Sequence, residues 1–159
     1  DLTFKDTSGR NALMQAVLYG NQETALVLLE SGVSLENSDE LGLTPLTLSV
    51  RYGDTEMTKI LLEKGAKVDS KMEDGSTPLI FASLEGQLSA VRLLIEYKSD
   101  VSIRTEYGET ALIVASFEGF LGVVRLLLDA GADINAVNDE GNGIVKSGSS
   151  ITTEGSILG

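Results

Sequence analysis

The side chains that most often carry out catalysis or bind transition metals are missing from this 159-residue chain, which contains neither histidine nor cysteine. Any nucleophile and its base would have to come from serine, lysine and carboxylates. Those residues are spread along the chain, and adjacent acids such as Asp39 and Glu40 lie in segments typical of solvated turns. The composition therefore argues against an enzyme, and it excludes disulfides, cysteine nucleophiles and thiolate metal sites.

Two segments come close to known ligand-binding loops without completing their patterns. Residues 143–148 (GIVKSG) contain Lys146 followed by serine, but the glycine that precedes the lysine of a phosphate-binding loop is absent. Residues 133–138 (DINAVN) superficially resemble a calcium loop through Asp133, Asn135 and Asn138. The glycine of the sixth position is missing, however, and Ile144 occupies the position of the terminal glutamate. We therefore predict no cofactor and no metal site.

The charge balance is strongly acidic, with 24 acidic and 12 basic residues and a formal net charge of −12. Nucleic acids and anionic membrane surfaces are both bound through basic patches, and no such patch is present. No apolar run approaches the roughly 18 residues of a membrane-spanning helix. We therefore predict a protein or peptide partner and neither a nucleic-acid nor a membrane partner.

The elements that position these residues repeat at a fixed spacing, because glycine recurs every 33 residues at Gly9, Gly42, Gly75, Gly108 and Gly141. Other columns keep the same spacing: Leu13, Leu46, Leu79 and Leu112; Gly20, Gly53, Gly86 and Gly119; and Leu29, Leu62, Ile95 and Leu128. A period of this length indicates a solenoid, whose stacked units form an extended surface suited to binding.

Each 33-residue unit carries the signals of two helices. Thr44 is a natural N-cap and Pro45 suits the first helical position, where its missing N–H has no intrahelical role. Gly53 can adopt the positive φ that ends the first helix. A second helix follows, with apolar residues such as Met57 and Leu61 at helical spacing.

With these signals, the units resemble ankyrin repeats. The clearest stretches are residues 42–49 (GLTPLTLS) and 126–135 (LLLDAGADIN). The resemblance implies an all-α solenoid of antiparallel helix pairs with projecting β-hairpin loops. It covers four repeats, at residues 6–38, 39–71, 72–104 and 105–137. They lie within a predicted ankyrin-repeat domain of residues 1–142, and an irregular Gly/Ser-rich tail, residues 143–159, follows the domain.

Departures from the family pattern predict local differences. The histidine that often follows Thr-Pro-Leu is replaced at all four positions, so one familiar hydrogen-bond network between repeats is not expected. Lys98 replaces the glycine that ends the second helix of repeat three. If Lys98 adopts a left-handed conformation, the strain is about 1 kcal/mol, and we expect a different helix end there.

The two ends of the array must be covered, because an interior repeat exposes apolar surface when its neighbour is removed. Polar residues in two columns favour repeat one as an end repeat: Gln15 in the column of Leu48, Phe81 and Val114, and Gln22 in the column of Leu88 and Leu121. Repeat four is apolar in its second helix, like an interior unit. We expect apolar residues of the tail to cover it or to enter a groove: Ile144, Val145, Ile151, Ile157 and Leu158.

The resemblance also implies where a partner binds, namely at the loop tips and at the exposed edge of each first helix. Residues at those positions are Tyr19, Leu41, Leu43, Arg51, Tyr52, Asp74, Leu84, Glu85, Tyr107, Glu109, Phe117 and Glu118. Tyr19 and Tyr52 share one column of this edge, and Leu84 and Phe117 share the neighbouring column. This pattern predicts an exposed apolar stripe with aromatic hot spots. The alternative is that these side chains pack partly beneath the loops.

Acidic residues crowd the same face in repeats three and four: Glu73, Asp74, Glu85, Glu106, Glu109, Glu118, Asp139 and Glu140. This pattern predicts a partner segment with basic residues flanking an apolar anchor, attracted by complementary charge. The alternative is a solvated acidic rim with no partner.

These features favour a non-catalytic protein–protein interaction module that binds a partner segment in a concave groove. A second interpretation is a regulatory or targeting segment of a larger enzyme or channel, since the chain begins at Asp1. No signal sequence and no Asn-x-Ser/Thr sequon is visible, so a cytoplasmic location is the default expectation.

Overall fold

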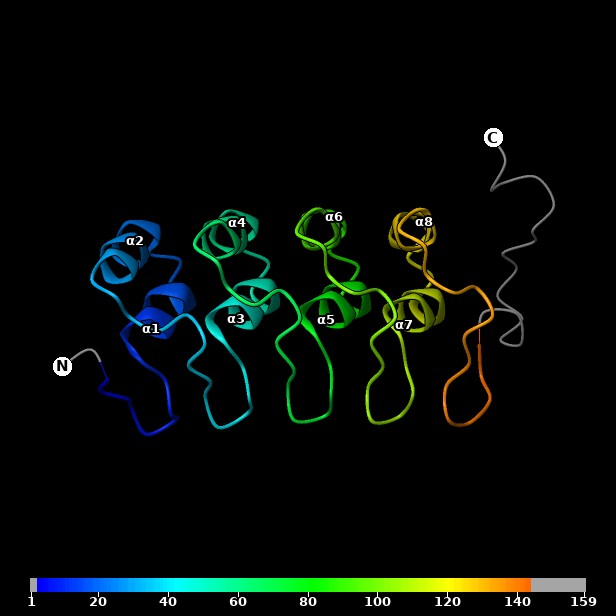
Figure 1. Cartoon of the computed structure of the whole chain (residues 1–159), viewed down its shortest axis with the longest axis horizontal. Coiled ribbons are helices and arrows are strands. Elements are labelled where there is room, and N and C mark those ends of the chain that lie inside the picture. The colour runs from blue at the N-terminus through cyan, green and yellow to red at the C-terminus, as the bar shows by residue number, and fades with distance from the viewer. Residues whose placement is uncertain (1–2, 144–159) are drawn as a thin grey trace.

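The structure, a computed structural model, describes residues 3–143 and contains eight α-helices within that range. They form four antiparallel pairs stacked side by side (Figure 1). The helices are α1 (Ala12–Leu18), α2 (Gln22–Glu30), α3 (Pro45–Arg51), α4 (Thr55–Glu63), α5 (Pro78–Leu84), α6 (Leu88–Glu96), α7 (Ala111–Glu118) and α8 (Leu121–Asp129). The first helices of the pairs form one row beside the projecting loops, and the second helices form an outer row (Figure 1).

The core is a continuous strip that runs along the stack. In the inner row, the leucine column of the sequence is fully buried: Leu13, Leu46, Leu79 and Leu112. In the outer row, Leu61, Leu94 and Leu127 are equally buried. Each helix pair buries its apolar face against its neighbours, which is how a solenoid builds a core from units too small to fold alone.

The predicted helix starts are confirmed. Thr44 Oγ1 accepts the backbone N–H of Thr47 at 3.3 Å, and Pro45 occupies the first turn of α3. Asn11, Thr77 and Thr110 accept the corresponding N–H groups at the starts of α1, α5 and α7. These side chains satisfy donors that the helix itself leaves without a partner.

The positive backbone angles also lie where the sequence predicts them. Gly53 and Gly86, which follow α3 and α5, have φ of 69° and 65°. Lys98 has φ of 67°, the one non-glycine residue with positive φ in the described part of the chain. The expectation of a different helix end in repeat three is wrong. The N–H groups of Lys98 and Ser99 donate to Ile95 and Leu94, as those of Gly65 and Ala66 donate to Leu62 and Leu61 after α4. The strain is therefore borne by the Lys98 backbone.

The projecting loops are tight turns without strand ladders. Within residues 3–143 no strand is present, and the single β-bridge joins Val137 to Gly143. Each loop is closed by two backbone bonds, as from Asp39 N–H to the Leu43 carbonyl at 3.1 Å and from Gly42 N–H to the Asp39 carbonyl at 3.0 Å. Adjacent loops are joined by bonds such as Glu40 N–H to Ser8 O. Gly9 lies against the next loop, where a Cβ would be in van der Waals contact with the Asp39 backbone at 3.4 Å.

The two ends of the array differ from the prediction in one respect. Gln15 is half-buried, and its Nε2 donates to Asp6 Oδ2, so it takes part in a polar contact inside repeat one. Gln22 does not indicate an end repeat, because Leu88 and Leu121 in its column are themselves 41% and 54% exposed. Gln22 is exposed as well, and Thr55 in the same column is half-buried, so a polar residue at this position does not distinguish an end repeat. The predicted apolar cover from the tail begins at Ile144 and lies outside the described residues.

In the described range, no helix combines the length and the apolar character that crossing a membrane requires.

Candidate protein-binding groove

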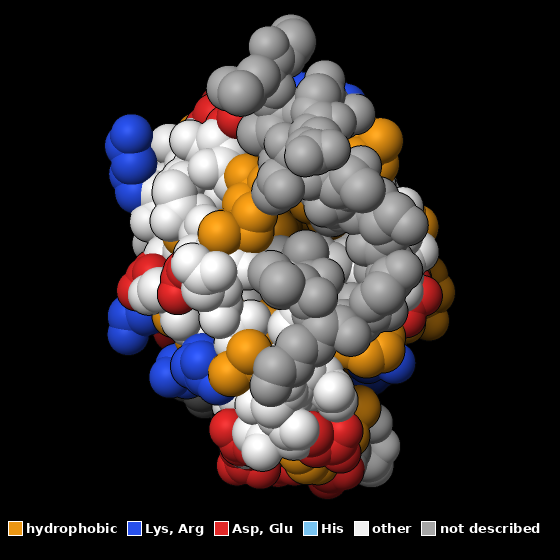
Figure 2. Space-filling view, turned by 90° about the vertical axis from the view of Figure 1, so that its right-hand side faces the viewer, with side chains coloured by type: hydrophobic (Ala, Val, Ile, Leu, Met, Phe, Trp, Pro, Cys, Tyr) orange, Lys and Arg blue, Asp and Glu red, His pale blue; other side chains and the backbone are white. Residues whose placement is uncertain are grey.

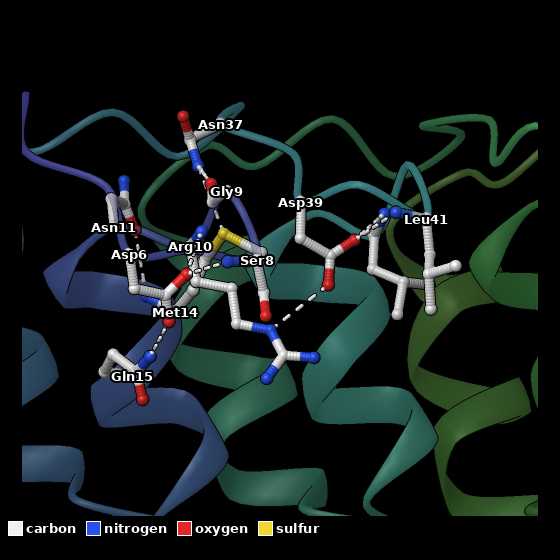
Figure 3. A network of polar contacts seen from close by, with 11 residues as sticks. Asp6, Ser8, Gly9, Arg10, Asn11, Met14, Gln15, Asn37, Asp39 and Leu41 are labelled. Carbon is white, nitrogen blue, oxygen red and sulfur yellow. Dashed lines mark hydrogen bonds and ion pairs between the residues drawn. The ribbon is translucent and has the colours of Figure 1, made fainter.

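The first two loops are held together by a polar network (Figure 3). Asp6 Oδ1 accepts the N–H groups of Ser8 and Arg10 at 2.8 and 2.9 Å. The N–H of Arg10 is the main cause that lowers the pKa of Asp6 below its ordinary value of 3.8. Arg10 Nε in turn donates to Asp39 Oδ2 at 3.3 Å and forms an ion pair that links loop one to loop two.

One loop position determines how each turn is closed. Asp39, at this position, accepts the N–H groups of Leu41 and Leu43, both at 3.0 Å. Thr105 and Asn138 stand 66 and 99 residues further along and make the same pair of bonds. Met72 occupies the position in repeat three and has no oxygen to offer. There Asp74 accepts the N–H of Ser76 instead. The Met72 side chain instead lines a hollow beside the loops.

Two hollows lie between the loops and the first helices. The central hollow, of about 340 Å³, is lined from repeats two and three: Leu41, Leu43, Arg51, Met72, Glu73, Asp74, Ser76, Ile80, Phe81 and Leu84. The C-terminal hollow, of about 320 Å³, is lined from repeat three onward: Asp74, Ser76, Ile80, Leu84, Thr105, Tyr107, Glu109, Val114, Phe117, Glu118, Asn138, Glu140 and Asn142. Four residues of repeat three line both, so the two hollows form one groove.

The groove combines an apolar interior with an acidic edge. Ile80 is buried, whereas Leu84 and Phe117 are 41% and 61% exposed, so large apolar side chains contact water along it. Four carboxylates line the C-terminal hollow: Asp74, Glu109, Glu118 and Glu140. Arg51, in the central hollow, is the one basic residue among the lining residues. Seen from the C-terminal end, acidic side chains gather where the loops project (Figure 2).

The structure brings most of the predicted binding residues together. Nine of the twelve line one or both hollows: Leu41, Leu43, Arg51, Asp74, Leu84, Tyr107, Glu109, Phe117 and Glu118. Tyr19, Tyr52 and Glu85 do not line either hollow. They are the C-cap residues of α1, α3 and α5, where Tyr19 and Tyr52 are 75% and 56% exposed. Their place in a binding surface stays a prediction.

Leu43 differs from the expectation for a loop residue at the surface. It is only 3% exposed and belongs to the main core cluster. The reason is the Asp39 turn, which receives the Leu43 N–H and directs the chain inward just before α3 begins. Leu43 therefore contributes to the wall of the central hollow, and the neighbouring Leu41, which is 56% exposed, is the accessible residue.

Several lining residues were not predicted from the sequence. Ile80 lies one helical turn before Leu84 on α5, and Val114 lies one turn before Phe117 on α7. Side chains three or four residues apart on a helix share a face, so this spacing was a signal that could have found them. Met72 and Asn138 have no comparable signal, because their roles depend on how each loop is closed.

Comparison with known families identifies the class of protein that this architecture defines. A family model described as ankyrin repeats in three copies matches residues 1–72 and 68–138. The chain therefore belongs to the ankyrin-repeat family. Domains of this family generally serve as protein–protein interaction modules and are typically non-catalytic. A comparison with curated proteins finds no match.

Proposed function

We propose that this chain is a protein-interaction module whose groove binds an extended segment carrying basic residues beside an apolar anchor. The observation that supports this most strongly is the joining of the two hollows through Ile80 and Leu84, with carboxylates along one side. The shape and the charge belong to the same surface, and a partner segment complementary to both is the simplest occupant.

The apolar anchor is argued from exposure. Leu84 is the last residue of α5 and Phe117 is the last but one of α7, and both side chains line the C-terminal hollow. The exposed ring of Tyr107 lines it from the loop side. Large apolar groups in a cleft of this size lose contact with water when a complementary side chain enters. Aromatic residues at the centre of such a contact often contribute most of the binding free energy.

The basic residues are argued from charge. Glu109, Glu118 and Glu140 take no part in a salt bridge within residues 3–143, where the three salt bridges are Arg10–Asp39, Lys59–Glu63 and Arg104–Asp139. Unneutralised carboxylates around a cleft raise the local concentration of cations and speed association with a basic segment. Lysine or arginine beside the anchor would supply the missing partners.

The test uses peptides of equal length that carry one leucine or phenylalanine flanked by lysine and arginine, with binding followed by fluorescence anisotropy. Phe117→Ala and Leu84→Ala should each weaken binding of the best peptide roughly tenfold, because each removes an exposed apolar contact. Tyr52→Ala tests whether the surface extends beyond the hollows.

The matched control is Val27→Ala on α2, a side chain that is 61% exposed on the outer row and lines neither hollow. It should leave the affinity unchanged. Equal losses from Val27→Ala and Phe117→Ala, or preference for peptides in which the flanking basic residues are replaced by glutamate, would contradict the proposal.

A further inference from the structure

The last described turn contains a dipeptide with chemistry of its own. Six asparagines occur in the chain, and Asn142 is the one followed by glycine. Glycine has no side chain to hinder its backbone nitrogen, which can therefore approach the side-chain carbonyl of a preceding asparagine. We propose that Asn142–Gly143 is a site of spontaneous deamidation and isoaspartate formation, a covalent change at the C-terminal edge of the groove.

The reaction needs water as its one co-reactant. The backbone nitrogen of Gly143 attacks Cγ of Asn142, and an N–Cγ bond forms. The Cγ–Nδ2 bond breaks, and Nδ2 leaves as ammonia after taking up the proton that the Gly143 nitrogen gives to solvent. The cyclic imide is then hydrolysed at either carbonyl, which gives aspartate or isoaspartate at position 142. One neutral amide is replaced by one carboxylate, and nothing is oxidised or reduced.

The fold requires the glycine that makes this reaction accessible. A Cβ at position 143 would lie 2.5 Å from the Ala136 carbonyl oxygen and 3.0 Å from Cγ1 of Val137. Any other residue would collide with backbone at the Val137–Gly143 bridge. A bulkier residue at position 143 would slow the attack, but it would also displace the backbone at the Val137–Gly143 bridge.

The nitrogen of Gly143 also differs from that of the chemically related Asp74–Gly75 pair. The Gly75 N–H donates to the Met72 carbonyl at 3.0 Å, so that nitrogen is engaged within its turn. Among residues 3–143, the Gly143 N–H has no acceptor. The attacking group at position 143 is thus free of any hydrogen bond within that range, whereas the equivalent group at position 75 is not.

The products would disrupt the turn that holds Asn142. Its Nδ2 donates to Glu140 Oε2 at 3.0 Å, and a carboxylate there would repel Glu140. Its backbone N–H donates to Asn138 Oδ1, and its carbonyl accepts the Asn138 N–H at 2.7 Å. Isoaspartate lengthens the backbone by one carbon between these two partners, so both bonds cannot persist. Deamidation would open the last loop and add an acid to the C-terminal hollow.

The experiment ages the intact chain in warm, mildly alkaline buffer and separates the products by anion exchange. Peptide mapping by mass spectrometry locates the change, and an isoaspartyl methyltransferase assay detects the isomer. A more acidic species should accumulate with its new charge and its isoaspartate at position 142. Asn142→Gln should abolish that species, and the matched control Asn135→Gln, an exposed asparagine outside the groove, should not.

Charge gain at another asparagine, or persistence of the acidic species in Asn142→Gln, would overturn the assignment. A second readout tests the structural effect without ageing: Asn142→Asp should speed hydrogen exchange of the Asn138 and Gly141 amides. Unchanged exchange would contradict the opening of the loop. Neither readout depends on a binding partner, so the deamidation site is tested independently of the proposed function.

Discussion

Repeats two and three have the same helix–loop–helix fold but differ in the side chains that stabilise it. Repeat two closes its loop with the buried Asp39, caps α4 with Asp54 and follows α4 with Gly65. Repeat three has Met72, Gln87 and Lys98 at the same three places. Gln87 makes no cap bond, and within residues 3–143 its Oε1 and the Oγ of Ser83 are buried without a hydrogen-bond partner.

Repeat three, which lacks these three features of repeat two, is also the repeat whose residues line both hollows. Met72 faces the central hollow where an aspartate would bind the backbone, so one position serves the loop in repeat two and the groove in repeat three. In the described chain, the backbone bond that joins neighbouring loops is also missing between Leu41 and Glu73, although it is present between the other pairs. The difference teaches that closing the loop and lining the groove compete for the same position, and in the proposed function this competition trades local stability for binding surface.

The largest predicted effect is the loss of the Asp39 turn. Asp39→Ala should destabilise the chain by about 3 kcal/mol, because it leaves the buried N–H of Leu43 without an acceptor and Arg10 without its ion-pair partner. Urea unfolding followed by circular dichroism measures the change. Met72→Ala, at the equivalent place in repeat three, removes only a partly buried side chain and should cost about 1 kcal/mol. Equal losses would remove the contrast between the two repeats.

The next effect is a gain in repeat three. Gln87→Asp should raise the free energy of unfolding by about 1 kcal/mol, because aspartate can accept the Ala90 N–H at the start of α6 as Asp54 accepts that of Met57. Asp54→Ala, the reverse change in repeat two, should lose a similar amount. A Gln87→Asp variant no more stable than the parent would show that the missing cap has no cost.

A gain of about 1 kcal/mol or slightly less is expected from Lys98→Gly, because glycine adopts a φ of 67° without the penalty that a Cβ brings. The matched control is Lys64→Gly, which places glycine at the C-cap of α4, where φ is −84°. That change should destabilise the chain slightly, since glycine gains only unfolded-state freedom there. Both are read from thermal unfolding, and a loss of stability in Lys98→Gly would be the contrary result.

The smallest effect concerns pH and the loop network of repeat one. Hydrogen bonds from the Arg10 N–H first, and then from Ser8 and Gln15, lower the pKa of Asp6. The folded state then favours the carboxylate, so this contribution to stability is present above pH 3.8 and is lost as the pH falls through the folded pKa. A carboxyl NMR titration should give a midpoint below 3.8, and Asp6→Asn should lack this pH dependence. A midpoint at or above 3.8 would contradict the network.

The sequence predicted the helix pairs because their signals are local and repeat. Thr44 with Pro45, the glycines after each first helix and the buried leucine column each identify one position of the unit, and the spacing of 33 residues aligns them. The left-handed Lys98 followed from the same alignment. Tertiary packing had little freedom to override these signals, since each repeat contacts mainly its neighbours.

The groove was harder to predict because it depends on depth and on loop closure. Leu43 and Leu41 look alike in the sequence, yet the Asp39 turn buries one and exposes the other. The Gln22 column seemed apolar, but Leu88 and Leu121 lie at the surface. Met72 joined the groove only because Asp74 closes its loop instead. Such distinctions arise from contacts between segments, which residue types at a fixed spacing do not encode.

The central claim is that the acidic groove attracts a basic partner, and the association rate tests it most directly. Glu109→Lys with Glu118→Lys should be compared with Glu56→Lys and Glu96→Lys, which change the net charge equally on exposed outer helices. Stopped-flow binding of the best basic peptide should show the groove pair slowed roughly tenfold or more at low salt, converging with the parent at high salt. The outer pair should slow far less, and equal slowing in both pairs would contradict the account.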